Sequence, residues 1–138
     1  MLDKERILSK IDELEQYMIE LKSVAPTSYS EYVENIEKKR SCERLLHIMI
    51  ECVIDICTLI VKGMKLGLPT EEEDLFEKLR KRNVITPQMK EILKKMKGFK
   101  NILVHMYSEV NDELVFENLK NIKDFEKFKK QILKFLKE

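Results

Sequence analysis

One long apolar stretch, residues 42–61, contains the feature that most restricts how this chain can fold. Most of its polar residues recur every three or four positions, which places them on one narrow line of a helix. This polar line extends slightly beyond the stretch and consists of Arg40, Arg44, His47, Glu51, Asp55, Thr58 and Lys62. A helix that is apolar on its other sides must be packed over most of its surface. The pattern therefore predicts a central helix inside a helical bundle.

The same stretch is long enough to cross a membrane, since roughly 20 apolar residues span a bilayer. It also contains charged residues that would be costly in lipid, namely Glu43, Arg44, Glu51 and Asp55. We therefore expect no membrane span. The first ten residues, MLDKERILSK, lack the pattern of a signal peptide. The chain is thus expected to be cytoplasmic.

The rest of the chain also favours helices, because glycine and proline occur three times each. An apolar stripe at helical spacing near the N-terminus consists of Ile7, Ile11, Leu14, Met18 and Leu21. The expected helical segments are 3–25, 28–64, a shorter one opened by a Thr70–Glu73 capping box, 87–105, and a last region from 111 or 112 onwards. That last region is either one helix or two with a bend near Asn121. We predict one domain over residues 1–138, an all-α up-and-down bundle of four or five helices.

The three cysteines are Cys42, Cys52 and Cys57, an odd number without the spacing typical of a metal site. We expect buried free thiols in a reducing compartment.

Two interpretations of the polar line remain open from the sequence. It is either a thin solvent-facing seam, held by pairs such as Arg40–Glu43 or Arg44–Glu51, or a polar wall between helices or between subunits. A wall with two arginines, two carboxylates and a histidine would suit phosphate binding or a dimer interface. The overall charge does not decide between them, because 26 basic and 25 acidic residues give a net charge of +1.

A second polar group lies in the segment Gly98–Tyr107, which reads GFKNILVHMY. Asn101 and His105 are four residues apart and therefore share a helix face. Lys100 and Tyr107 lie on a neighbouring face. From spacing alone, a histidine near the end of a helix often has no catalytic role.

This segment resembles the signature of the HepT-like toxins of the HEPN superfamily, in which arginine is followed after four to six residues by histidine, often extended to histidine-x-tyrosine. Here it reads Lys100-Asn101-Ile102-Leu103-Val104-His105-Met106-Tyr107. Three further parts of the chain also resemble the family: residues 40–56 resemble its central helix, and Leu66-Gly67-Leu68-Pro69 and the phenylalanine-rich last helix also fit. The resemblance covers nearly the whole chain.

The resemblance implies a homodimer that acts as the toxin of a type VII-like toxin–antitoxin pair. Such toxins are metal-independent endoribonucleases that need no cofactor. Their partner is an MntA-like nucleotidyltransferase antitoxin, which transfers AMP to the motif tyrosine, here Tyr107. His105 is then the expected acid–base residue, and Lys100 the expected cation. Residues with expected supporting or RNA-binding roles are Asn101, Arg40, Arg44, Glu51 and Asp55.

Lys100 departs from the family pattern, because lysine keeps the charge of arginine but loses its planar, two-pronged donor group. Three outcomes remain open: Lys100 serves less efficiently, Arg40 or Arg44 supplies a guanidinium, or the chain is an inactive dimer that binds the nucleotidyltransferase. The preceding Lys90, Lys94, Lys95 and Lys97 form either an RNA-backbone contact or a solvated face.

Overall fold

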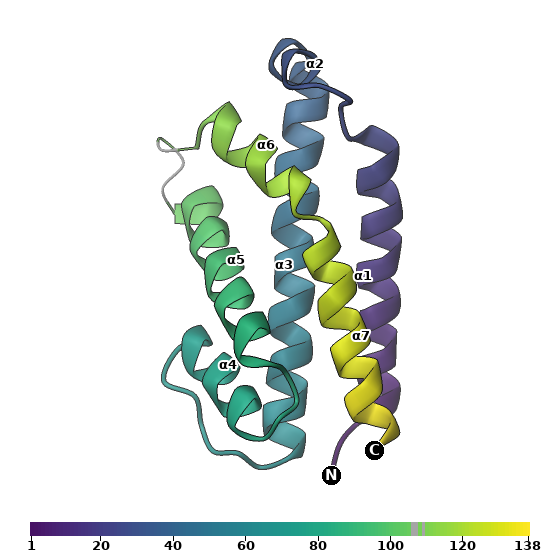
Figure 1. The fold of residues 1–138 in the computed structure, drawn as a ribbon, viewed down its shortest axis with the longest axis vertical. Helices are drawn as coiled ribbons and strands as arrows, with labels where there is room; N and C mark the ends of the chain where they lie inside the picture. The colour runs from purple at the N-terminus through teal and green to yellow at the C-terminus, as the bar shows by residue number, and fades with distance from the viewer. Residues whose placement is uncertain (106–107, 109) are drawn as a thin grey trace.

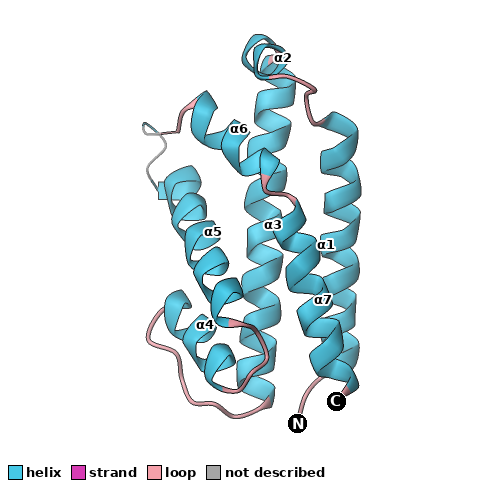
Figure 2. Ribbon diagram, viewed as in Figure 1, coloured by secondary structure: helices cyan, strands magenta, loops and turns pink. Residues whose placement is uncertain are grey.

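A computed structural model describes residues 1–105, 108 and 110–138. These residues form seven α-helices and no strand (Figure 2). The helices are α1 (Lys4–Val24), α2 (Tyr29–Glu34), α3 (Ile36–Gly63), α4 (Glu72–Lys81), α5 (Pro87–His105), α6 (Asp112–Lys120) and α7 (Lys123–Lys137). The predicted all-α class is confirmed. No helix among the described residues combines the length and apolarity that a membrane crossing requires.

The long helices run up and down around α3, which lies in the centre of the molecule (Figure 1). Helix α1 packs along one side of α3, and α5 lies on the other side, with α6 and α7 returning across the front. Short α2 sits at one end of α3, and short α4 packs against both α3 and α5 at the opposite end. The arrangement places α3, α4 and α5 in mutual contact, and this junction contains the polar group described below.

The core follows the apolar patterns of the sequence. The N-terminal stripe is buried along α1, with Ile7, Leu14 and Leu21 fully inaccessible to solvent. Helix α3 contributes the most buried residues, which are Cys42, Leu46, Met49, Ile50, Cys52, Val53, Ile54, Ile56, Cys57, Ile60 and Val61. The prediction of a central helix packed on most of its surface is thus confirmed.

Side-chain caps begin most helices where the sequence predicted them. Asp3 accepts a hydrogen bond from the backbone of Arg6 at 3.1 Å. Thr86 and Asn111 likewise accept from residues three positions later, at 3.1 and 2.8 Å. Each cap satisfies a backbone N–H that the first turn of a helix leaves without an intrahelical partner.

Two expected boundaries differ from the structure. The segment expected to be helical from 28 to 64 breaks at Asn35, whose extended backbone lets its side chain cap α3 by accepting from the Lys38 N–H at 3.0 Å. The expected Thr70–Glu73 capping box is wrong, because α4 begins after Glu71 without a side-chain cap. The Thr70 N–H instead donates to the Asp74 carboxylate at 3.2 Å. With the bend at Asn121, the Asn35 break explains why seven helices replace four or five.

Candidate functional site

The last turns of α5 carry Lys100, Asn101 and His105 of the predicted motif. Thr86 and Pro87 start this helix, and apolar residues such as Phe99 fix it against the core. Lys100 is buried, Asn101 is half-buried, and His105 is exposed at the end of the helix. Since a helix turns by roughly 100° per residue, Lys100 and His105 project about 140° apart around the axis. The two motif residues therefore face different surroundings within one chain.

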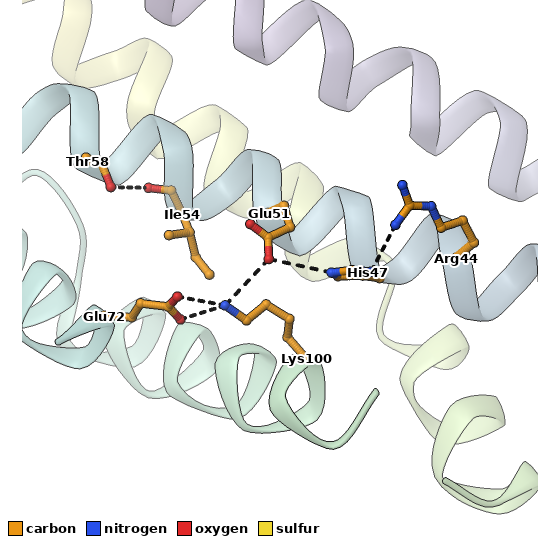
Figure 3. Close-up of polar contacts among 7 residues, drawn as sticks. All are labelled: Arg44, His47, Glu51, Ile54, Thr58, Glu72 and Lys100. Atoms are coloured by element: carbon orange, nitrogen blue, oxygen red, sulfur yellow. Dashed lines mark hydrogen bonds and ion pairs between the residues drawn. The ribbon is translucent and has the colours of Figure 1, made fainter. Parts of the chain in front are cut away.

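Lys100 is the one buried charged residue among those that the structure describes, with 6% of its surface exposed. Its ammonium Nζ lies 2.7 and 2.9 Å from the two carboxylate oxygens of Glu72, the first residue of α4. It also lies 3.6 Å from Oε1 of Glu51 on α3. Figure 3 shows the ammonium between the two carboxylates. Lys100 therefore joins three helices through ionic contacts.

Glu51 connects this junction to the polar line of α3. Its Oε1 lies 3.6 Å from Nε2 of His47, and Nδ1 of His47 lies 3.2 Å from Nη1 of Arg44 (Figure 3). A guanidinium can only donate, so Nδ1 accepts and the ring proton of neutral His47 lies on Nε2, directed toward Glu51. The result is a continuous series of contacts from Arg44 through His47 and Glu51 to Lys100.

The polar line thus combines the two interpretations that the sequence left open. Its middle forms a polar wall between helices, where Glu51 meets Lys100. Its ends make local or peripheral contacts: Arg40 pairs with Glu43 at 2.9 Å, as predicted, and Asp55 pairs with Lys10 of α1 at 3.4 Å. The expected direct Arg44–Glu51 pair instead runs through His47.

Arg40 and Arg44 also border an open groove of about 580 Å³ between the end of α1 and the start of α3. The groove is lined by Glu20, Ser23, Val24, Arg40, Ser41, Arg44 and Leu45. It offers guanidinium and hydroxyl donors beside a small apolar surface. Arg44 is therefore connected to Lys100 through His47 and Glu51. Both arginines also line the groove between α1 and α3.

Two of the four lysines before the motif form ion pairs with α4. Lys90 forms an ion pair with Glu77, and Lys97 lies 3.7 Å from Glu73. Lys95 is exposed and borders a pocket of about 240 Å³ between α3, α5 and the α6–α7 bend. Helix α5 therefore does not present a continuous row of four unpaired lysines.

The three cysteines are buried thiols, as the sequence predicted. Burial raises the pKa of Cys42 and of Cys52 to about 11, and it raises the pKa of Cys57 as well. No cluster of three or more potential metal ligands occurs among the described residues.

Sequence reasoning missed Glu72, which makes the closest contact with Lys100. Its acidic neighbours, Glu71 and Glu73, are indistinguishable from it by composition, and Lys100 lies 28 positions further along the chain. No local sequence pattern indicates the Glu72–Lys100 pair, because the pair forms only when α4 packs against α5. The predicted modification site, Tyr107, lies outside the described residues.

Comparisons with known proteins agree with this fold and identify the family. A family model described as "Ribonuclease HepT-like" matches residues 7–132. A Shewanella oneidensis protein described as "mRNA nuclease HepT" is 39% identical over 79 residues, which are 56% of this chain and 59% of that protein. An Aphanizomenon flos-aquae protein described as "tRNA nuclease HepT" is 27% identical over 110 residues, or 80% of this chain and 75% of that protein.

A solved structure extends the comparison to three dimensions. It contains a tri-AMPylated Shewanella oneidensis HEPN toxin in complex with MNT antitoxin, and its toxin chain superposes with a TM-score of 0.85. The two chains are 31% identical, and the match covers 96% of this chain and 98% of the other. With the family model matching nearly the whole sequence, the chain belongs to the ribonuclease HepT-like family.

Proposed function

We propose that this chain is the ribonuclease toxin of a type VII-like toxin–antitoxin pair and cleaves RNA without a metal. The observation that carries the proposal is the exposed His105 at the end of α5, in a chain similar to proteins described as mRNA and tRNA nucleases. An exposed imidazole can meet a large polymer substrate, and histidine is the side chain most often used for proton transfer at neutral pH.

The reaction uses a nucleophile that RNA itself supplies. His105, as a base, accepts the proton of a ribose 2′-hydroxyl, and the oxygen attacks the adjacent phosphorus. The bond from phosphorus to the 5′-oxygen breaks, and that oxygen takes up a proton from water, to which His105 then returns the proton it accepted. The products are a 2′,3′-cyclic phosphate and a 5′-hydroxyl. A nearby cation stabilises the negative charge that accumulates on the phosphoryl oxygens in the transition state.

Lys100 is proposed as that cation, with Arg44 and Arg40 contributing positive charge from α3. The series of contacts that runs from Arg44 through His47 and Glu51 to Lys100 supports a common site for Arg44 and Lys100. Glu51 and Asn101 are proposed to orient the site. The pairing of Asp55 with Lys10 supports a role in holding α1 against α3.

The proposed partner is an MntA-like nucleotidyltransferase antitoxin that transfers AMP to Tyr107. The complex of the similar HEPN toxin with MNT antitoxin, in which the toxin is tri-AMPylated, supports this proposal. An added AMP two residues beyond His105 would repel RNA phosphate. We propose that the toxin acts as a homodimer, which would bring two copies of the motif together.

A second candidate function is that of an inactive dimer that binds the nucleotidyltransferase. The observation favouring it is the engagement of Lys100 with two carboxylates, which occupies the expected catalytic cation.

The test is an RNA cleavage assay with the purified chain in EDTA, followed by analysis of the product ends. The ribonuclease proposal predicts cleavage in EDTA and cyclic phosphate ends. Cleavage that requires Mg²⁺ and leaves 3′-hydroxyl ends contradicts the mechanism. Intact RNA at high protein concentration supports the binding subunit.

A further inference from the structure

The contact between Lys100 and Glu72 leaves the ammonium little capacity for another ligand. An ammonium has three N–H donors. Two carboxylate oxygens of Glu72 lie within hydrogen-bonding distance, and Glu51 approaches from a third position. With 6% of the residue exposed, an RNA phosphate cannot reach the ammonium without displacing a carboxylate.

The local charge also opposes phosphate binding. Lys100 contributes one positive charge, while Glu51 and Glu72 contribute two negative charges. A phosphate approaching these three residues would meet a net negative charge close to the cation, where repulsion is strongest, because Arg44 is separated from Lys100 by His47 and Glu51. Removal of one carboxylate charge would make the group neutral.

Glu72 makes the closer of the two contacts with Lys100, and Glu51 is shared with His47. Glu72 is the first residue of α4, where the positive end of the helix dipole stabilises a carboxylate charge. Its side chain is 34% exposed, whereas that of Lys100 is 8% exposed. Glu72 therefore stands at the solvent-facing side of the pair.

We propose that Glu72 is a positioning residue that holds the Lys100 ammonium in a neutralised, buried position and thereby restrains RNA cleavage. The proposal rests on the ribonuclease function proposed above. Under this proposal, the Glu72 carboxylate, in addition to the replacement of arginine by lysine, limits how well position 100 can bind phosphate. RNA phosphate competes with the Glu72 carboxylate for Lys100.

The direct test is Glu72→Gln, which removes the charge and keeps the shape of the side chain. We expect its RNA cleavage rate to exceed that of the wild type by about two- to tenfold, because a freed cation stabilises the transition state. The matched control is Glu73→Gln, which removes a charge from the same turn of α4, where Glu73 lies 3.7 Å from Lys97 of α5. An equal gain in both variants would assign the effect to net charge and overturn the proposal.

The gain must also depend on Lys100. In a Lys100→Met background, Glu72→Gln should no longer raise the rate. A gain that persists without the ammonium would show that Glu72 acts through another group. If Glu72→Gln does not fold, as judged by urea unfolding, Glu72→Asp gives the same test. The shorter carboxylate loosens the contact, so a smaller gain in rate is expected, and an unchanged rate would contradict the proposal.

Binding separates this proposal from the ribonuclease proposal. In a His105→Ala background, the dissociation constant for single-stranded RNA is measured against salt concentration. The logarithm of the association constant falls linearly with the logarithm of the salt concentration. One additional phosphate contact in Glu72→Gln should make this slope steeper by about 0.7. If no variant cleaves RNA, the ribonuclease proposal fails, while a steeper slope still supports competition between the Glu72 carboxylate and RNA phosphate for Lys100. An unchanged slope, or no RNA binding by either protein, overturns the role of Glu72.

Discussion

The Lys100 ammonium and the Glu72 carboxylate form a two-point contact, at 2.7 and 2.9 Å, that joins α5 to α4. The family motif has arginine where this chain has Lys100, and the sequence alone indicated a weaker phosphate ligand there. The structure adds that the lysine is engaged by carboxylates from two neighbouring helices. The proposed activity at this site should therefore depend on the carboxylates that contact the cation as well as on which cation is present.

Lys100→Arg should raise the RNA cleavage rate. A guanidinium has five donors, so it can keep a carboxylate contact and still present donors to a phosphate. We expect a gain of about two- to tenfold in initial rate, measured with the same RNA substrate. Lys100→Met provides the lower reference. A rate for Lys100→Arg that is unchanged or lower would mean that position 100 is not a phosphate ligand.

Tyr107 should be the AMP acceptor when the chain is incubated with its nucleotidyltransferase and ATP. Peptide mass spectrometry would locate the adduct, and RNA cleavage by the modified protein should fall. Tyr107→Phe should abolish the modification, whereas Tyr29→Phe, at an exposed tyrosine of α2, should not. An adduct confined to Tyr29 or another residue would refute the assignment.

Glu77 should make stability depend on pH. Hydrogen bonds from Arg80 and Lys90 lower the pKa of Glu77 to about 2, below the value of roughly 4.3 for an unfolded chain. A carboxylate with a lowered pKa in the folded state contributes its full stabilisation above the unfolded value and loses it as pH falls toward 2. Glu77→Gln should therefore unfold at lower urea concentration than the wild type at pH 7.

This difference in urea midpoint should shrink as the pH falls from about 4.5 toward 2. Glu91→Gln, on the exposed side of α5, is the matched control and should follow the wild-type curve. A difference between Glu77→Gln and wild type that stays constant down to pH 2 would show that the ionised Glu77 carboxylate, paired with Arg80 and Lys90, does not contribute to stability.

The features predicted correctly from sequence are those determined by local patterns. The α1 stripe, the polar line of α3 and the cap at Thr86 depend on spacing within a few turns. The break at Asn35 was missed because apolar and charged residues continue on both sides of it, and the cap uses one side chain in an extended conformation. The start of α4 was misplaced because several acidic residues compete for the same helix end.

The candidate site likewise contains residues to which the sequence pointed and residues to which it did not. The sequence predicts a catalytic role for His105 from the resemblance of its motif; the structure places it at an exposed helix end, and the role stays a prediction. Glu72 was not identified, because its contact with Lys100 depends on the packing of two helices separated by a loop. The link through His47 was missed for a different reason: side chains four residues apart on a helix can pair or not, depending on rotamers that spacing does not determine.

A comparison of three proteins tests whether this chain cleaves RNA with His105 as its acid–base residue. The cleavage rate of a defined RNA in EDTA is compared for the wild type, His105→Ala and Val104→Ala. Val104 is the exposed neighbour in the same helical turn and serves as the matched control. We predict cleavage by the wild type and Val104→Ala, with a loss of about 10²-fold or more in His105→Ala. Equal rates for the wild type and His105→Ala would show that His105 is not the acid–base residue.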